Sequence, residues 1–332
     1  MRKFANLRKI FERNFRVTRL YATYLESFPE LITKELLDSV CEGGDISKET
    51  AISAILCQLL GLDAEGSAED RVIFRDYIIP SVKLLDANKY KSNPYYKSIN
   101  IPSVKDGAWE LRQEAYEPYR AVVCGDMIMR EDFSEVAPLG FFEERFEFPA
   151  ILENGNEWMT LTPVDLDTCQ EAINAARGRV VTFGLGLGYY AYMVSIKPDV
   201  ESVTVVERSE EVIALFKKYI LPQFPSPEKI NIIAADAIEY AKLTMPGEKF
   251  DVAFVDVWRD ASDGSEFYKK MKPCEALCPT TEFHWWIENF IVCRLRALKF
   301  EKLSQAFDDG MLKASYEEIT RTLTDKQELI KE

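Results

Sequence analysis

Three glycines alternate with two leucines directly after the apolar run Val180–Phe183. Glycine permits a tight turn between a strand and a helix, and it lets a ligand approach the main chain closely. The candidate ligand contacts in this loop are Gly184, Leu185, Gly186 and Gly188. The spacing differs from a dinucleotide fingerprint, because Tyr189 stands where that fingerprint has its third glycine. A tight turn without a ligand is the structural alternative.

Three acidic residues follow later apolar runs at the points where those runs end. Glu207 follows Val203–Val206, and its carboxylate can accept hydrogen bonds from both hydroxyls of a ribose. Asp236 can accept a hydrogen bond from an adenine amino group, while the backbone N–H of Ala237 reaches a ring nitrogen. Asp256 lies at the mouth of the predicted sheet, where ligands of open α/β folds bind. Each acid has a structural alternative, since an acid at a strand end is often the N-cap of the next helix.

The elements that must position these residues alternate between strand and helix over residues 180–257. We predict strands at Val180–Phe183, Val203–Val206, Ile230–Ala234 and Val252–Val255, and helices over Tyr189–Val194, Glu210–Tyr219 and Ala237–Leu243. Uniformly apolar strands joined by helices are typical of a parallel sheet that is covered on both faces. We therefore predict an α/β fold with a doubly wound, mostly parallel Rossmann-like sheet.

With this order and spacing, the glycine loop and the first two acids resemble the class I S-adenosylmethionine-dependent methyltransferase superfamily. The motifs are Val180–Gly188, Val203–Glu207 and Ile233–Ala237, and the resemblance covers about residues 157–265. Within the superfamily, Val203–Glu211, Asp236–Tyr240 and Phe250–Asp256 look most like the spermidine-synthase-like branch. The resemblance implies S-adenosyl-L-methionine as cofactor and methyl transfer to an acceptor that the sequence does not identify. Arg208, beside Glu207, joins the expected cofactor contacts.

Methyl transfer is an in-line displacement, so the enzyme mainly aligns donor and acceptor. Asp256 is the residue that we expect to orient or deprotonate the acceptor, and Asp260 is a second catalytic candidate. Asp260 and Asp263 could add charge for a cationic acceptor, or could simply be solvated loop acids. The segment Trp158–Thr160, just before the sheet, could cover the cofactor.

Three alternative functions stay open. A spermidine-synthase-like aminopropyltransferase is favoured by the acidic loop 256–264 and disfavoured by the spacing of its acids. A non-catalytic S-adenosylmethionine-binding module is favoured by Thr182, which stands where methyltransferases commonly carry an acid. A nicotinamide oxidoreductase is the weakest alternative because of Tyr189.

The net charge of −14 repels nucleic acid and anionic membranes, which favours a small-molecule acceptor over nucleic acid. The longest uncharged run, 180–196, contains three glycines and is shorter than the ~20 residues of a membrane span, so we expect no membrane partner. Seven of the first 20 residues are Arg or Lys; they could form an RNA-docking arm, but more often such a helix pairs with acidic neighbours. A homodimer stays open.

Seven cysteines at irregular spacing fit reduced thiols, and we expect a cytoplasmic protein. One group of residues, Cys274, Cys278, His284 and Cys293, invites a zinc interpretation, but it holds a single tight ligand pair, and we expect no metal. The predicted layout has four segments. They are a helical N-terminal domain (1–117), a β-hairpin neck (118–162), the cofactor-binding α/β domain (163–285) and a helical C-terminal extension (286–332).

Overall fold

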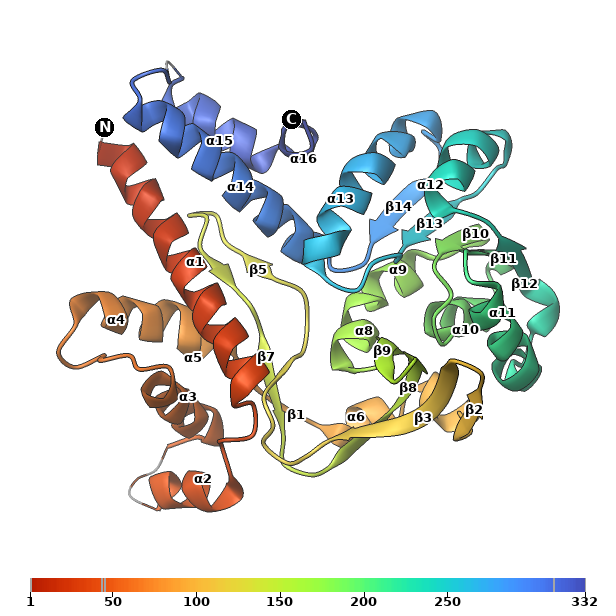
Figure 1. Cartoon of the computed structure of the whole chain (residues 1–332), viewed down its shortest axis with the longest axis horizontal. Helices are drawn as coiled ribbons and strands as arrows, with labels where there is room; N and C mark the ends of the chain where they lie inside the picture. The colour runs from red at the N-terminus through yellow and green to blue at the C-terminus, as the bar shows by residue number, and fades with distance from the viewer. Residues whose placement is uncertain (1, 43, 45, 313, 332) are drawn as a thin grey trace. The chain divides into compact units, whose positions relative to one another are not determined.

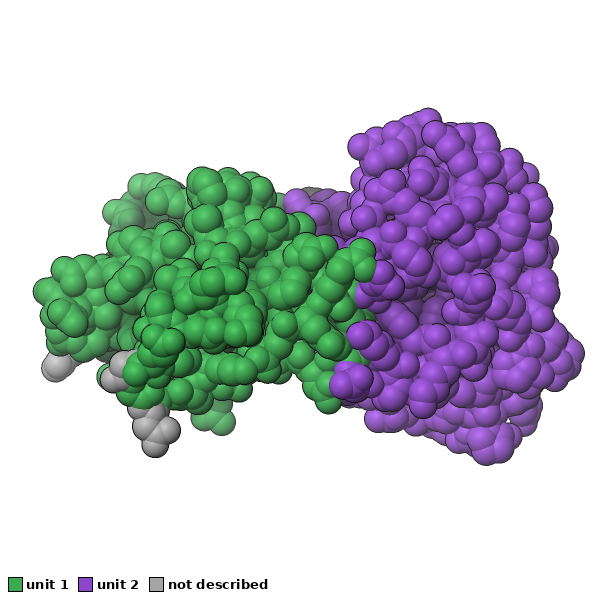
Figure 2. Space-filling view, turned by 90° about the horizontal axis from the view of Figure 1, so that it is seen from below, with its two compact units in different colours: residues 1–87, 116–146, 289–332 green, residues 88–115, 147–288 purple. Residues whose placement is uncertain are grey.

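The computed structural model describes residues 2–42, 44, 46–312 and 314–331. The chain folds into two compact units, which Figure 2 shows in different colours. Unit 1 comprises residues 1–87, 116–146 and 289–332, and unit 2 comprises residues 88–115 and 147–288. The units therefore group segments differently from the predicted layout, since the C-terminal helices belong with the N-terminal ones.

Unit 1 is mostly helical. Its elements are α1 (Arg2–Ser27), α2 (Lys34–Cys41), α3 (Lys48–Leu59), α4 (Ala68–Ile73), the π-helical turn η1 (Phe74–Ile78), α5 (Ile79–Ser81), α14 (Glu288–Asp308), α15 (Tyr316–Thr324) and α16 (Lys326–Leu329) (Figure 1). The helix α3 begins after Ser47, whose side chain accepts a hydrogen bond from the Thr50 N–H. This bond satisfies one of the backbone donors that a helix leaves free at its beginning.

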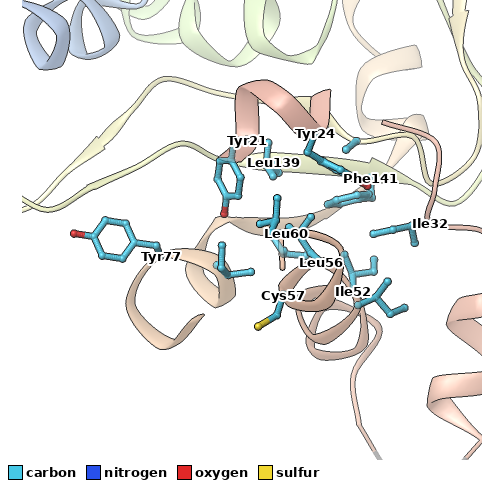
Figure 3. Packing of buried hydrophobic residues seen from close by; sticks show 14 of the residues in the cluster. Tyr21, Tyr24, Ile32, Ile52, Leu56, Cys57, Leu60, Tyr77, Leu139 and Phe141 are labelled. Carbon is cyan, nitrogen blue, oxygen red and sulfur yellow. The ribbon is translucent and has the colours of Figure 1, made fainter. Parts of the chain in front are cut away.

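The core of unit 1 combines these helices with short strands. β1 (Val82–Leu85) runs parallel to β7 (Leu139–Phe142), which pairs antiparallel with β4 (Val122–Val123). β5 (Ile128–Met129) and β6 (Glu135–Val136) form a separate pair. Figure 3 shows Ile52 and Leu56 of α3 beside Leu139 and Phe141 of β7, with Tyr21 of α1 over them. All five side chains are buried, so burial of apolar surface stabilises this unit.

The basic residues of α1 form ion pairs within unit 1. Arg13 lies 2.5 Å from Glu69, Arg16 lies 2.7 Å from Asp70, and Arg8 lies 2.8 Å from Asp308. Lys3 pairs with Glu317 at 3.4 Å. Pairing with acidic neighbours, the second of the two interpretations of this segment, is therefore what these four side chains do.

Unit 2 contains a five-stranded sheet in which all strands are parallel, as predicted. The strands are β10 (Gly178–Phe183), β11 (Val200–Glu207), β12 (Ile230–Ala234), β13 (Val252–Val255) and β14 (Glu282–Trp285), in the spatial order β12-β11-β10-β13-β14. The chain moves outward from β10 to β12 and then returns to the other side of β10. Such a reversal leaves a crevice at the carboxyl ends of the central strands, where ligands of this kind of sheet bind.

The connections between these strands are helical. They include α10 (Tyr189–Ser195), α11 (Glu210–Leu215) with the π-helical η2 (Phe216–Ile220), α12 (Ala237–Glu239) with η5 (Tyr240–Thr244), and α13 (Ala261–Met271). The predicted helices after the first three strands are confirmed. Before the sheet, α8 (Pro163–Thr168) and α9 (Gln170–Ala175) follow one another.

The expectation of an all-helical segment over residues 1–117 is wrong beyond residue 81. After β1, and after the short helices α6 (Ala87–Lys91) and α7 (Pro94–Ser98), the chain forms β2 (Val104–Asp106) and β3 (Trp109–Tyr116). These join β8 (Phe146–Glu153) and β9 (Asn156–Thr160), which lie within the predicted β-hairpin neck, in a sheet of order β2-β3-β8-β9. Trp109 and Leu111 of β3 are buried while the residue between them is not, a period of two that favours a strand.

No helix within the described ranges is both long and apolar enough to span a membrane.

Candidate functional site

The glycine loop lies at the carboxyl end of β10, between β11 and β13. The Gly184 N–H donates to the Val206 carbonyl at 2.9 Å, and Gly184 has a φ of +95°. A Cβ on Gly184 would lie 1.9 Å from the backbone oxygen of Asp256. Glycine is therefore required here both by the close approach of the Asp256 backbone, directly after β13, and by the positive φ.

Glu207, at the end of β11, contacts this loop directly. One carboxylate oxygen, Oε2, accepts a hydrogen bond from the Leu185 N–H at 3.1 Å, and Oε1 accepts one from the Ser209 N–H at 2.8 Å. The side chain is buried. A carboxylate offers about four acceptor positions, so two remain for hydroxyl donors. The structure thus brings together the loop and the acid that the sequence placed on neighbouring strands.

Asp256, at the end of β13, belongs to the same place in the fold. Its N–H donates to the Phe183 carbonyl at 2.9 Å, which fixes it beside the first residue of the loop. Burial raises the pKa of the Asp256 carboxyl well above its usual range, and the charges of Asp165 and Glu207 raise it further. Both of those neighbouring charges are negative, so the ionised form gains no stabilisation from them.

Asp165 is a site residue that the sequence analysis did not identify. It lies in the first turn of α8, where its Oδ2 accepts hydrogen bonds from the Thr162 N–H at 2.8 Å and hydroxyl at 2.9 Å. Burial raises the pKa of Asp165 to about 6. Asp256 and Asp165 also help burial to raise the pKa of the Cys169 thiol. Thr162 and Asp165 have the spacing of a capping box, so the sequence could have predicted that Asp165 caps α8. The sequence could not have predicted that Asp165 lies near Asp256.

Asp236 and Ala237 follow β12 as predicted, but the Asp236 side chain has a structural role. Its Oδ1 accepts hydrogen bonds from the Ile238 and Glu239 N–H groups, both at 2.9 Å, so it caps α12. Asp236 is exposed, and Oδ2 takes no part in these two bonds. The capping alternative is therefore realised, and one carboxylate oxygen is left over for a ligand.

Asp260 and Asp263 together cap α13. The Asp260 side chain accepts a hydrogen bond from the Ser262 N–H at 2.5 Å, and Asp263 accepts one from the Asp260 N–H at 3.1 Å. Both acids are exposed, whereas Asp256 is partly buried. The structure gives these two loop acids a role in starting a helix, independent of any acceptor.

The strand β9 lies against the glycine loop. The Leu187 N–H donates to the Met159 sulfur at 3.2 Å, and a Cβ on Gly186 would lie 1.9 Å from that sulfur. Two arginines lie over the ring of the preceding residue, Trp158, with guanidinium carbons at 6.0 Å for Arg208 and 5.7 Å for Arg259. Sequence reasoning proposed this strand as a cover but did not identify Arg259.

Two buried tryptophans follow the last two strands of the sheet. The indole N–H groups of Trp258, after β13, and Trp286, after β14, have no hydrogen-bond partner among the described residues. Trp258 stacks on Trp285, with ring centroids 6.4 Å apart. Ile287 then has a φ of +44°, which is rare for a β-branched residue. Unpaired buried donors cost free energy, so a ligand atom that accepts a hydrogen bond from either indole N–H would be stabilising.

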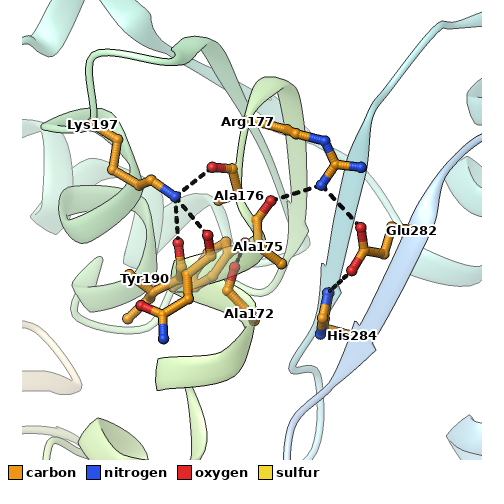
Figure 4. A network of polar contacts seen from close by, with 10 residues as sticks. Ala172, Ala175, Ala176, Arg177, Tyr190, Lys197, Glu282 and His284 are labelled. Atoms are coloured by element: carbon orange, nitrogen blue, oxygen red, sulfur yellow. Dashed lines mark hydrogen bonds and ion pairs between the residues drawn. The ribbon is translucent and has the colours of Figure 1, made fainter.

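His284 belongs to a network of polar contacts elsewhere in unit 2 (Figure 4). Its Nε2 lies 3.0 Å from Glu282, which also pairs with Arg177 at 2.9 Å. Beside them, the Lys197 ammonium donates to three carbonyl oxygens at the end of α9, those of Ile173, Asn174 and Ala176. A cation at the carboxyl end of a helix satisfies carbonyls that lack partners within the helix. No group of three metal-ligating side chains is present within the part of the chain that the structure covers.

Comparison with known proteins finds likeness in structure alone. No protein-family model matches the chain, and no curated protein matches its sequence. A spermidine synthase from Thermotoga maritima matches at 17% identity and a TM-score of 0.31, over 46% of this chain and 59% of the other. A probable spermidine synthase from Corynebacterium glutamicum ATCC 13032 matches at 21% identity and a TM-score of 0.28, over 37% of this chain and 50% of the other.

A putative SAM-dependent methyltransferase from Streptococcus mutans matches at 14% identity and a TM-score of 0.29, over 39% of this chain and 36% of the other. The chain thus spans less than two thirds of the length of each of these three proteins.

Proposed function

We propose that this chain binds S-adenosyl-L-methionine at the carboxyl edge of the five-stranded sheet and transfers its methyl group to a small acceptor. The observation that carries the proposal is the hydrogen bond between the Leu185 N–H and Glu207, beside the contact of Gly184 with Asp256. The glycine loop, Glu207 and Asp256 are far apart in the sequence, but they meet at the carboxyl edge of the five-stranded sheet. The strand order supports a doubly wound, Rossmann-like arrangement of the methyltransferase type.

The chemistry of the donor set fits the nucleoside. Glu207 keeps two acceptor positions for ribose hydroxyls, and Asp236 keeps one carboxylate oxygen for an adenine amino group. The Met159 sulfur fills the space over Gly186, so a ligand that approaches the loop there must displace it. Methionine has a flexible, unbranched side chain, which makes that displacement inexpensive.

When bound, the cofactor supplies a methyl group that is already activated on a sulfonium. The chain's own residues then hold the two reactants in line, which can account for a large part of a rate enhancement. Asp256 accepts the acceptor's proton in this proposal. Burial and the two neighbouring acids raise its pKa, which makes the Asp256 carboxylate a stronger base than a carboxylate in water.

Aminopropyl transfer is the second candidate, and one observation favours it. Asp165 and Glu207 lie close enough to Asp256 to raise its pKa. Three carboxylates are thus close together, and such a group attracts a cationic ligand. The capping role of Asp260 and Asp263 weighs against it, since those acids are already used by α13. A binding module without catalysis is the third candidate, with Thr182 buried in β10 where an acid is common.

Ligand-dependent melting tests the proposal, because a native-state ligand raises the melting temperature. S-adenosylmethionine or its demethylated product should stabilise the protein, and NAD should not. Stabilisation by NAD with neither sulfur nucleoside effective would overturn the proposal. Tighter binding of the decarboxylated nucleoside would favour aminopropyl transfer instead. For either transferase, Asp256→Asn should leave donor affinity nearly unchanged and lower turnover by about 100-fold.

Replacement of Glu207 tests the ribose contact. Glu207→Gln removes the charge and one acceptor oxygen, and a hydrogen bond to a charged group is worth roughly 1.5–3 kcal/mol. We therefore expect donor affinity to fall about 10- to 100-fold by calorimetry. The matched control is Glu201→Gln, an exposed acid on the same strand. If both variants bind like the wild type, the ribose lies elsewhere.

A further inference from the structure

Arg208 and Arg259 come from different parts of unit 2 and meet at one aromatic ring. Arg208 directly follows Glu207 at the end of β11, and Arg259 lies three residues after Asp256 beyond β13. Their guanidinium carbons lie 6.0 and 5.7 Å from the centroid of the Trp158 ring. Both arginines are exposed. Two cations are thus gathered at the edge of the sheet where the proposed ligand binds.

Neither guanidinium has a carboxylate within ion-pair distance among the described residues. The chain as a whole has 55 acidic and 41 basic residues, so two arginines that share a ring instead of pairing with acids are notable. Each cation is attracted by the face of the indole, but the two positive charges repel each other. An anion bound to both would relieve that repulsion and satisfy their donors.

The surroundings hold the Trp158 ring and the Arg259 backbone in place before any ligand binds. Trp158 packs edge-on against Trp109, with ring centroids 5.0 Å apart, and the next residue, Met159, contacts the glycine loop. The Arg259 N–H donates to Asp263 at 3.2 Å, which anchors its backbone at the start of α13. A site whose parts are already ordered loses less entropy when a ligand binds.

We propose that Arg208 and Arg259 together bind one carboxylate or phosphate group of the molecule that occupies the carboxyl edge of the sheet. The guanidinium fork matches the planar geometry of such oxyanions and can form two parallel hydrogen bonds. The inference rests on the proposed function for the position of the ligand. The anion has two candidate sources, the α-carboxylate of S-adenosylmethionine and an acidic group on the acceptor. A polyamine acceptor would be repelled by this pair.

Calorimetry on Arg208→Gln, Arg259→Gln and the double variant tests the proposal. If the anion is the donor's own carboxylate, the double variant should bind S-adenosylmethionine at least 10-fold more weakly. Its affinity for the decarboxylated nucleoside should stay the same. If the anion belongs to the acceptor, both nucleosides should bind all variants equally. Inorganic phosphate or malonate should then stabilise the wild type in thermal melts and lose this effect in the double variant.

Arg294→Gln is the control, because Arg294 is an exposed arginine in unit 1 and its loss removes one positive charge, as each single variant does. The proposal is overturned if the double variant and this control give the same values for both nucleosides, phosphate and malonate. If no sulfur nucleoside binds the wild type but the anions bind it and not the double variant, the proposed function fails and the anion site stands.

Discussion

Asp165 is a single residue whose ionisation should be visible in the stability of the protein. Its pKa is raised from 3.8 to about 6 by burial. The folded state therefore binds more protons than the unfolded state between about pH 4 and 6, and the free energy of unfolding falls as the pH rises through that window. A shift of this size corresponds to at most about 3 kcal/mol.

We expect Asp165→Asn to flatten this part of the pH dependence. The asparagine oxygen can still accept the hydrogen bond from the Thr162 N–H, so the cap of α8 is retained. Urea unfolding at pH 4.5 and pH 7 gives the difference for each protein. Asp199→Asn, at an exposed position of unit 2, is the control and should keep the wild-type slope. An unchanged slope in Asp165→Asn would show that the carboxyl titrates as it does in water.

At the level of elements, the sequence predicts the parallel sheet and much less of what lies around it. Apolar runs with glycine and acids at their ends specify β10, β11 and β13, because these strands are mostly buried, and the apolar run of β12 predicts that edge strand although it is only half-buried. The strands β2 and β3 were missed because β2 has only three residues and the alternation in β3 is confined to its first residues. Short strands with a weak pattern are stabilised by pairing with neighbouring strands, and this pairing exists only in the folded chain.

The candidate site divides in the same way. Glu207 and Asp256 could be placed from the sequence, since strand ends fix their positions. The capping roles of Asp236 and Asp260 could be stated as alternatives but not chosen, because a cap and a ligand contact use the same residue types. The closeness of Asp165 to Asp256 and the contact of Met159 with the loop depend on how separate elements pack, and no local pattern encodes that.

The contact between β9 and the glycine loop gives a prediction at the same scale. Gly186→Ala places a residue with a Cβ at a φ of +48° and against the Met159 sulfur. A left-handed conformation alone costs about 1–2 kcal/mol, and overpacking adds about 1–3 kcal/mol. Gly155→Ala is the control, because Gly155 has a φ of +80° with open space around it. Urea unfolding should therefore show a larger loss of stability for Gly186→Ala.

Combining Gly186→Ala with Met159→Ala separates the two costs. The double variant should recover the part of the loss that comes from overpacking, while the backbone strain stays. Equal losses for Gly186→Ala and Gly155→Ala would show that Met159 does not lie over the loop.

At the level of the whole chain, unit 1 is built from segments that lie far apart in the sequence. Phe11 of α1 and Phe300 of α14 stack with ring centroids 4.0 Å apart, and both are buried. Phe4 stacks on Phe307 at 4.4 Å. Such pairs set which helices share a unit, and the amphipathic pattern of α1 does not specify α14 as its partner. This is why the boundaries predicted from the sequence differ from the units.

A double-mutant cycle on Phe11 and Phe300 tests whether the two ends of the chain pack together. Each change to alanine should cost about 3–5 kcal/mol, and the pair should be coupled by about 0.5–1.5 kcal/mol. Phe15→Ala is the matched control on the same helix, since Phe15 is 70% exposed and its loss should cost under about 0.5 kcal/mol. Additive losses, or a Phe11→Ala variant as stable as Phe15→Ala, would contradict the contact.

The same variants can show which unit is affected, because all five tryptophans lie in unit 2 and the longest helix, α1, lies in unit 1. Tryptophan fluorescence therefore follows unit 2, whereas circular dichroism follows the helices of both units. If the units unfold separately, Phe11→Ala should lower the urea midpoint seen by circular dichroism and leave the fluorescence midpoint almost unchanged. A coincident shift of both midpoints would instead mean that the chain unfolds in one cooperative step, because coincident transitions by different probes indicate two-state unfolding.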